Sequence, residues 1–323
     1  MFQVDPNLWL QSFGSPFLTW LMLGISELGY TWFYVALIVV LGFGVRLRPT
    51  LGVMLALLLA GVATHAAKSG FELPRPADVD ARVLYKLEAP RALVADGGAP
   101  SFLALPTPEA RDALRLTEEP DYGFISGHTS AATAMSIGLL LFFGLRRRAA
   151  WLVLLAWPLL MGLSRMYLGR HFLADVAGGL VVGSAAACLA YWLLPIAADA
   201  ATRRRRSWLL AGGIGLLCLL SPFTSLLHPA GLGQLAGLVV VLGVLAWRGY
   251  PSDGGRAWQR AARVALLCAL YLLVDSVTGR IGEAAGWSEA SPAWVPVVAI
   301  ATAVMFLGAI AVSRRLGLYR DPA

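Results

Sequence analysis

The chain has 323 residues, of which 58% are hydrophobic and only 14% are charged, and its mean hydropathy is +0.69. Because an ordinary soluble domain carries about 25% charged residues, this composition excludes a typical soluble domain and indicates a membrane protein. The net charge of +7 would suit a nucleic-acid-binding protein, but the distribution of the charges argues against that class.

Apolar runs long enough to cross a bilayer follow one another along most of the chain. We predict an all-α polytopic membrane protein with spans near residues 30–45, 50–66, 127–145, 150–164, 175–195, 207–222, 231–247, 262–278 and 293–312. An earlier run, 8–25, has Gly14 and Pro16 near its middle, which favours a re-entrant or interfacial segment over a full span. No basic segment followed by a cleavage site stands near the start, so we expect no removable signal peptide.

The three cysteines all fall inside predicted spans, at Cys188, Cys218 and Cys268. In such positions a cysteine behaves as a small hydrophobic residue. We therefore expect neither a disulfide framework nor a metal cluster.

Arginine is concentrated in the links on one side of the predicted membrane. Those links hold 16 of the 26 Lys and Arg residues with three acidic residues, whereas the opposite links hold 10 basic and 16 acidic residues. The positive-inside rule makes the arginine-rich side cytoplasmic. Because the basic residues are divided among membrane links and form no stripe on a soluble surface, we expect no nucleic-acid partner.

Three groups of ionisable residues then reach the other, outer face of the membrane. They lie in "KSGFELPRP" (68–76), in "ISGH" (125–128) and in "SRMYLGRHFLAD" (164–175). Each has an ordinary explanation when taken alone: a snorkelling lysine, a serine N-cap and an ion cluster in a link. Ionisable groups beside apolar segments are costly unless they have partners or a function, so their convergence favours a site.

The residue types at this face suit phosphoryl transfer. Two arginines, a lysine and a helix N-terminus would bind an anion of about two negative charges. Two histidines could supply a nucleophile and a proton donor. His171 and Asp175 are four residues apart, so in a helix the carboxylate would hold the imidazole in one tautomer. No carboxylate cluster suited to Mg²⁺ is evident, and arginines would have to supply the positive charge.

The patterns K-x6-RP at 68–76, SGH at 126–128 and SR-x5-H-x3-D at 164–175 resemble the three-part signature of the type 2 phosphatidic acid phosphatase family. That family also includes vanadium haloperoxidases, which share its phosphate or vanadate pocket. The resemblance covers roughly residues 1–200 and departs from the family at Ile125, where proline is usual. A haloperoxidase is disfavoured because those relatives are typically soluble.

The resemblance implies a role for each signature residue. His171 would attack phosphorus and form a phosphohistidine, Asp175 would orient His171, and His128 would protonate the leaving oxygen and then activate water. The groups that would bind the phosphoryl oxygens are the side chains of Lys68, Arg75, Ser126 and Arg165 and the backbone N–H of Gly127. Neither a metal nor another cofactor is expected.

Other polar residues near this face are harder to assign. Arg170 lies outside the signature and would either bind a second phosphate or headgroup or be a solvated link residue. His65 lies one turn before Lys68, and we expect it to pack and not to line the site. His228 is expected at the membrane interface.

We predict two domains. Residues 1–200 would form the phosphatase helical bundle, and residues 201–323 an accessory domain of about four more spans. The sequence leaves open whether the added spans serve dimerisation, lipid access or regulation. The long link 77–121 is either a loosely ordered surface loop or a lid that helps to choose the headgroup.

The predicted function is hydrolysis of a phosphate monoester or diphosphate on a lipid, at the outer face of a membrane whose composition suggests a bacterial inner membrane. Candidate substrates are polyprenyl diphosphates such as undecaprenyl diphosphate, phosphatidic acid and phosphatidylglycerophosphate. The alternatives are a lipid-linked phosphotransferase that uses the same site, and a lipid transporter in which the added spans do the work. The expected partners are the lipid substrate, the bilayer and, through the added spans, a second copy of the chain.

Overall fold

The computed structural model describes residues 1–86, 91–195 and 199–319. Within these ranges the chain is helical and forms no strand, although an isolated bridge pairs Asp80 with Asp96. Seven of the described helices are long and apolar enough to cross a membrane, or eight spans result if one bent pair of helices counts as a span. These features confirm the prediction of an all-α integral membrane protein.

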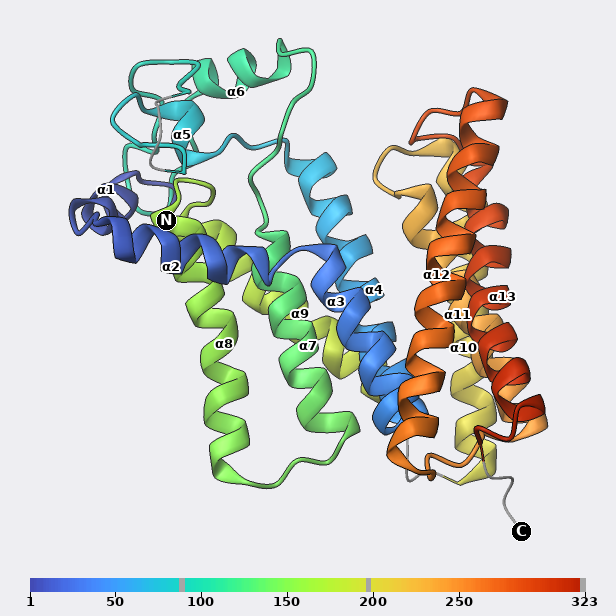
Figure 1. Ribbon diagram of the computed structural model, residues 1–323. Helices are drawn as coiled ribbons and strands as arrows, with labels where there is room; N and C mark the ends of the chain where they lie inside the picture. The colour runs from blue at the N-terminus through green and yellow to red at the C-terminus, as the bar shows by residue number, and fades with distance from the viewer. Residues whose placement is uncertain (87–90, 196–198, 320–323) are drawn as a thin grey trace.

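The first part of the chain forms a bundle around three central helices (Figure 1). Its helices are α1 (Asp5–Ser12), α2 (Pro16–Glu27), α3 (Thr31–Val39) with a π-helical turn (Val40–Val45), α4 (Leu47–Phe71), α5 (Pro76–Val79), α6 (Pro108–Arg115), α7 (Gly127–Phe142), α8 (Arg148–Tyr167) and α9 (Leu173–Leu193). Helices α4, α7 and α9 pack on one another, and α8 packs on α7.

The four predicted C-terminal spans are all present as helices, beside the first part (Figure 1). They are α10 (Ala200–Leu220), which ends in a 3-10 turn (Ser221–Phe223), α11 (Pro229–Arg248), α12 (Ala257–Ala285) and α13 (Trp294–Arg315). α11 packs on α13 and reaches α4. The ring centroids of His65 in α4 and His228 before α11 are 5.2 Å apart, so His65 packs between the two parts, as expected.

Glycine allows α7 and α9 to touch backbone to backbone. A Cβ atom at Gly183 would lie 2.4 Å from the Ser130 carbonyl oxygen, and one at Gly179 would lie 2.7 Å from the Ser126 carbonyl oxygen. Two small residues four positions apart are a common device for close helix packing in membranes. Their effect here is to join the N-terminal ends of the two helices, where the Ser126 N–H donates to the Asp175 carbonyl at 3.0 Å.

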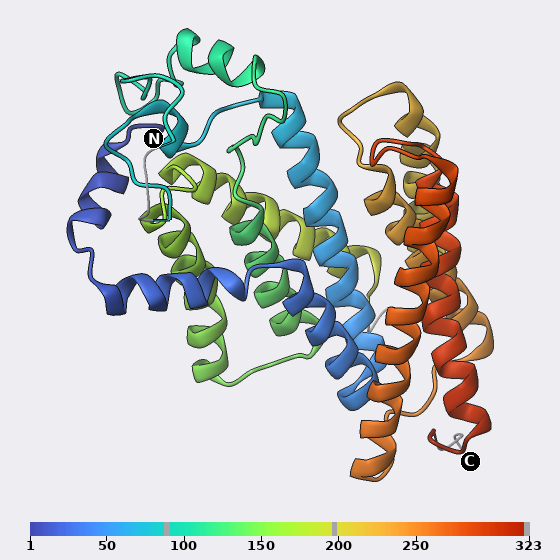
Figure 2. The ribbon, with the colours of Figure 1, turned by 45° about the horizontal axis from the view of Figure 1, so that its top comes forward.

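The segment 8–25, predicted to be re-entrant or interfacial, is broken between α1 and α2, and a bend follows it. α1 ends before Gly14, and α2 begins at Pro16 with the Ser15 side chain accepting a hydrogen bond from the Leu18 N–H. α2 and the helix that follows it are bent by 56°. In Figures 1 and 2, α2 runs across the direction of α8, and its Phe17 and Trp20 side chains are 78% and 75% exposed. Exposed aromatic residues of this kind are typical of a membrane–water interface.

The long link between α4 and α7 has a small core of its own and packs over the bundle (Figure 2). Val79 and Val83 from the link are buried together with Ala110 of α6, Phe172 before α9 and Phe2 near the start of the chain. The Lys86 N–H donates to the Leu168 carbonyl at 2.9 Å. Over its described residues the link is therefore ordered against the turn between α8 and α9, not loosely attached.

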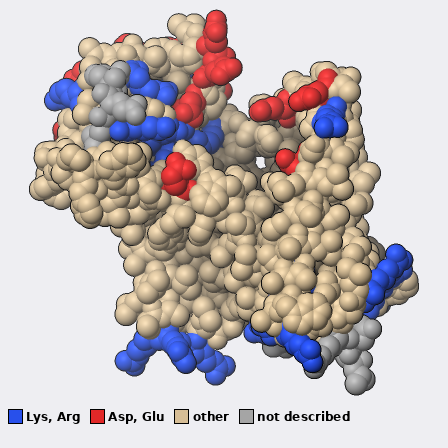
Figure 3. All heavy atoms as spheres, in the orientation of Figure 1, with Lys and Arg blue, Asp and Glu red and all other residues tan. Residues whose placement is uncertain are grey.

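Charge is distributed unequally between the two ends of the molecule. Figure 3 shows Lys and Arg gathered at the end opposite to α5 and α6, whereas the end that carries α5 and α6 mixes Lys and Arg with Asp and Glu. The arginine-rich end includes Arg46 before α4, Arg146 and Arg147 before α8, and the arginines 203–206 near the start of α10, as the sequence pattern predicts.

Candidate active site

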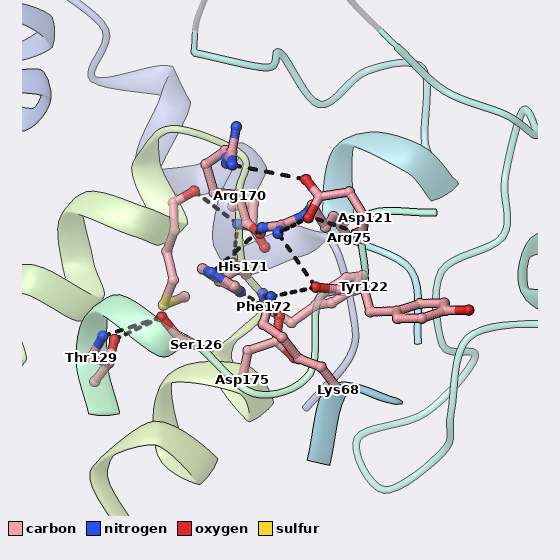
Figure 4. Close-up of polar contacts among 12 residues, drawn as sticks. Lys68, Arg75, Asp121, Tyr122, Ser126, Thr129, Arg170, His171, Phe172 and Asp175 are labelled. Atoms are coloured by element: carbon pink, nitrogen blue, oxygen red, sulfur yellow. Dashed lines mark hydrogen bonds and ion pairs between the residues drawn. The ribbon is translucent and has the colours of Figure 1, made fainter. Parts of the chain in front are cut away.

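The three groups of ionisable residues predicted to converge do so at one end of the bundle (Figure 4). Lys68 lies in the last turn of α4, Ser126 caps the N-terminus of α7, and His171 lies in the turn between α8 and α9. The charges of Lys68, Arg75 and Arg165 all act on His171. All eight predicted site residues belong to this cluster or to the helix ends that form it.

His171 and Asp175 form a buried pair. The Nδ1 atom of His171 is 3.1 Å from Oδ2 of Asp175, and the same oxygen accepts the Phe172 N–H at 2.9 Å. Burial, followed by the positive charges of Arg75, Arg165 and Lys68, lowers the pKa of His171 well below its ordinary value. A neutral imidazole that donates from Nδ1 to the carboxylate keeps a free electron pair on Nε2.

Arg75 stands next to that free nitrogen. Its Nη1 atom is 3.5 Å from Nε2 of His171 and donates to the Arg170 carbonyl at 2.9 Å. Its Nε donates to the Asp121 carbonyl at 3.1 Å, and its Nη2 donates to the Tyr122 carbonyl at 3.3 Å. Three backbone carbonyls thus orient the guanidinium so that an anion bound to it would lie beside Nε2.

The N-terminus of α7 contributes backbone donors. The Ser126 side chain accepts hydrogen bonds from the Thr129 N–H at 3.4 Å and the Thr129 hydroxyl at 3.0 Å. The N–H groups of Gly127 and His128 have no hydrogen-bond partner among the described residues. Free N–H groups at a helix start bind phosphate well, because they point outward and the helix dipole favours negative charge.

His128 lies close to the charged groups, with its Nε2 atom buried and without a partner among the described residues. Its ring packs edge-to-face on Tyr30, with the ring centroids 4.7 Å apart. Gly29 makes room for it, since a Cβ atom there would lie 2.3 Å from Cδ2 of His128. An unpartnered ring nitrogen at this place is available to exchange a proton with a ligand.

Arg165 and Lys68 complete the cationic lining. Nη1 of Arg165 donates to the Ser26 hydroxyl at 2.6 Å, whereas its buried Nε has no partner among the described residues. Nζ of Lys68 donates to the Tyr122 carbonyl at 2.7 Å. Both cations keep donors that are free for an anion.

Arg170 is not a solvated link residue. Its side chain is only 14% exposed, its guanidinium lies 4.7 Å from the centroid of the Tyr85 ring, and Nη2 is 3.9 Å from Oδ2 of Asp121. Burial and the neighbouring Arg75 lower the pKa of Arg170 to about 10. The remaining alternative, contact with a second phosphate or a headgroup, agrees with this position at the edge of the cluster.

An acidic residue of the long link, Asp121, contacts the site. Oδ1 of Asp121 is 2.5 Å from Nη2 of Arg75, so a carboxylate holds the guanidinium in this structure (Figure 4). Burial opposes ionisation of Asp121, but Arg75 outweighs it and lowers the pKa of that carboxyl group. Among the described residues, no three His, Cys, Asp or Glu side chains come together as a metal site requires.

Several supporting residues were missed by the sequence analysis. The fully buried Asn7 of α1 donates to the carbonyls of Met166 and His171 at 2.8 and 3.0 Å, and so fixes the turn that carries His171. Ser26 and Tyr30 contact Arg165 and His128, as described above. All three lie before the recognisable pattern, and each is a single polar or aromatic residue without a helical or strand period to mark it.

The comparisons with known proteins agree with the signature. The PAP2 superfamily model matches residues 49–198, a range that contains all eight predicted site residues, so this part of the chain is similar to the PAP2 superfamily. Phosphatidylglycerophosphatase B of Bacillus subtilis (strain 168) is 26% identical over 179 residues, which are 52% of this chain and 71% of that protein. The crystal structure of Aquifex aeolicus LpxE aligns at 20% identity with a TM-score of 0.44, covering 59% of this chain and 94% of that one.

Proposed function

We propose that the protein is a membrane lipid phosphatase that hydrolyses a phosphate monoester or diphosphate through a phosphohistidine intermediate at the outer face of the membrane. The observation that carries this proposal is the position of the buried His171. Its Nδ1 atom is 3.1 Å from Oδ2 of Asp175, and its Nε2 atom is 3.5 Å from Nη1 of Arg75. The match of residues 49–198 to the PAP2 superfamily model and the similarity to a protein named phosphatidylglycerophosphatase B support the reaction class.

In the first step, Nε2 of His171 attacks phosphorus, and the bond between phosphorus and the lipid oxygen breaks. His128 gives a proton to the leaving oxygen. Lys68, Arg75, Arg165, Ser126 and the Gly127 N–H hold the three equatorial oxygens, where the negative charge of the transition state is spread. Asp175 stabilises the positive charge that His171 gains when it carries the phosphoryl group.

In the second step, water attacks the phosphohistidine. His128, now neutral, takes a proton from the water, the phosphorus–nitrogen bond breaks, and inorganic phosphate leaves. The same cations hold the phosphoryl oxygens in both steps, because the phosphorus stays in place while its partner changes from lipid oxygen to nitrogen to water oxygen. His171 returns to the neutral state in which Nδ1 donates to Asp175.

The long link serves as a lid in this proposal. Asp121 contacts Arg75 and lies 3.9 Å from Arg170, so the link reaches the phosphate-binding cations directly. A phosphate that enters must displace the carboxylate of Asp121, and residues of the link then lie beside the headgroup. The link is therefore placed to influence which headgroup is accepted.

We propose that the two parts of the chain have the separate roles that the sequence suggests. Residues 1–200 carry the reaction, because all eight residues of the cluster and the supporting Asn7 lie there. Residues 201–323 form an accessory transmembrane domain, which contacts the first part chiefly through α4 and the turn before it.

The test is phosphate release by the purified protein in detergent, with a chelator present, from phosphatidic acid, phosphatidylglycerophosphate and undecaprenyl diphosphate. His171→Ala should abolish release, and His228→Ala, a histidine outside the cluster, should leave it unchanged. With substrate labelled in the transferable phosphate, the quenched wild-type enzyme should carry acid-labile label, and His171→Ala should carry none.

Three results would contradict the proposal. Release that the chelator abolishes would mean that a metal ion supplies the charge assigned to the arginines. Transfer of the label to an added acceptor lipid in preference to water would establish the phosphotransferase alternative. If no lipid released phosphate, the transporter alternative would be favoured.

A further inference from the structure

A cavity lined by arginines lies at the end of the molecule opposite to the candidate active site, where the two parts of the chain meet. It has a volume of about 490 Å³, within the ~300–1,000 Å³ range of small-molecule sites. The start of α4, the end of α9, the start of α10 and the end of α11 all contribute to its wall. The signature residues of the candidate active site take no part in it.

Three arginines line this cavity and have no acidic partner. The guanidinium groups of Arg48, Arg203 and Arg204 form no hydrogen bond or ion pair with any described residue. Arg48 lies 5.5 Å from the centroid of the Tyr250 ring, which also lines the cavity. Arg206, one turn away, differs because it donates to the Trp192 carbonyl at 2.6 Å. The cavity therefore concentrates positive charge that no acidic side chain among the described residues compensates.

Much of the cavity wall is apolar. Phe142, Leu193 and Leu242 line it from three different helices. On α10, the lining positions 200, 203, 204, 207 and 208 recur at helical spacing, so one face of that helix turns toward the cavity while Arg205 does not line it. Arginines and apolar side chains that line one cavity at the end of a transmembrane bundle match a phospholipid, whose phosphate would contact the arginines and whose chains would contact the apolar residues.

We propose that this cavity binds one anionic glycerophospholipid from the leaflet at the arginine-rich end of the molecule. The phosphate would lie among Arg48, Arg203 and Arg204, and an acyl chain would pack on Phe142 and Leu193. The bound lipid would fill the space between α9 and α10 and so hold the accessory helices against the catalytic bundle. This site lies at the opposite end from the candidate catalytic site, and it does not depend on the reaction proposed above.

Native mass spectrometry of the delipidated full chain would measure the binding, in titrations with phosphatidylglycerol and with phosphatidylcholine of the same acyl chains. The wild type should bind one phosphatidylglycerol more tightly than any phosphatidylcholine. The double variant R203Q/R204Q should bind that lipid roughly 30-fold more weakly, at about fivefold for each arginine near the surface. Lipid held at the candidate catalytic site contributes equally to every variant, so the comparison isolates the cavity.

Arg205→Gln is the matched control, because it removes the same charge from the same helix without touching the cavity, and it should bind as the wild type does. Ala246→Trp should block binding without removing charge, since Ala246 lines the cavity and is exposed there. If R205Q weakened phosphatidylglycerol binding as much as R203Q/R204Q does, the lipid would be attracted to the whole arginine-rich face and not to the cavity. That result would overturn the proposal. Unchanged binding in both R203Q/R204Q and A246W would overturn it as well.

Discussion

The Asp121 carboxylate pairs with the guanidinium of Arg75, which we propose binds the phosphoryl group of the substrate. Arg75 does not need this carboxylate for its orientation, since the carbonyls of Asp121, Tyr122 and Arg170 already hold it. A carboxylate beside an incoming dianion is repulsive and competes for the same donors. The contact between Asp121 and Arg75 therefore favours the empty site over the occupied one.

Asp121→Asn should lower KM for a lipid phosphate about fivefold, with kcat little changed, because the amide removes the competing charge and leaves the backbone contacts of Arg75 in place. Steady-state phosphate release measures both constants. Asp112→Asn is the control, since Asp112 lies in α6 and its carboxylate pairs, among the described residues, with Arg115 alone. A rise in KM for D121N would show that the carboxylate orients Arg75 and does not compete with the substrate.

His171 should stay neutral in the folded, substrate-free protein at pH 5.5. Its lowered pKa means that the uncharged form persists as the pH falls through the ordinary histidine range, so protonation of the nucleophile does not limit activity there. Nitrogen-15 NMR of histidine-labelled protein, assigned with His171→Ala, should show an Nδ1–H tautomer that does not titrate between pH 7 and 5.5. A midpoint near 6.5 for His171 would contradict this expectation.

The ionisable signature residues could be predicted from the sequence because each stands near apolar spans, whereas Ser126 and Gly127 were predicted from the resemblance to a known family. Asn7, Ser26 and Gly29 could not, for a physical reason. Their importance comes from one hydrogen bond or one close approach to a residue more than 90 positions away, which leaves no trace in local composition. Asp121 was visible only as one acid among several in a long link.

At the scale of the helices, the contact between α7 and α9 sets the geometry of the site. Gly183→Ala would place a methyl group 2.4 Å from the Ser130 carbonyl oxygen, so the two helices would have to separate. We expect phosphate release to fall at least tenfold, because Ser126 and Asp175 are joined across that contact. Gly215→Ala, in α10 with nothing within 4 Å, should behave as the wild type. Normal activity of G183A would show that the close packing is not needed.

The helices were predicted better than their ends. Hydropathy placed a span at 262–278, whereas α12 covers Ala257–Ala285. The helix continues into polar residues at both ends, because backbone hydrogen bonding does not stop where the apolar composition stops. The bend of 56° after α2 was also missed, since no proline marks it.

At the scale of the whole molecule, the unequal distribution of charge between its two ends predicts its orientation in the membrane. Link 77–121 should be outside the cell membrane and the links rich in arginine inside, if the positive-inside rule holds for this chain. After replacement of the three native cysteines, Ser101→Cys should react with a membrane-impermeant maleimide in intact cells, whereas Arg147→Cys should react only after permeabilisation. The reverse labelling would place the candidate catalytic site in the cytoplasm.

The two parts of the chain are separate in the sequence, but they share one buried core. Residues from both parts, such as Leu51 of α4, Leu238 of α11 and Phe306 of α13, belong to one buried apolar cluster. The boundary near residue 200 stays a prediction from the sequence, made because the signature and its spans end before that residue. Sequence analysis could not find the shared cluster, because apolar residues that face lipid and those that face another helix are equally hydrophobic.

The exposed aromatic side chains of α2 have a kinetic consequence. A helix that lies across the bundle with Phe17 and Trp20 outward would hold the neighbouring cations at the depth of lipid headgroups. The enzyme would then meet its substrate by diffusion in two dimensions, without extracting it from the bilayer. Its rate would follow the mole fraction of substrate among the surrounding lipids, and diluting that substrate with inert lipid would slow turnover even at constant bulk concentration.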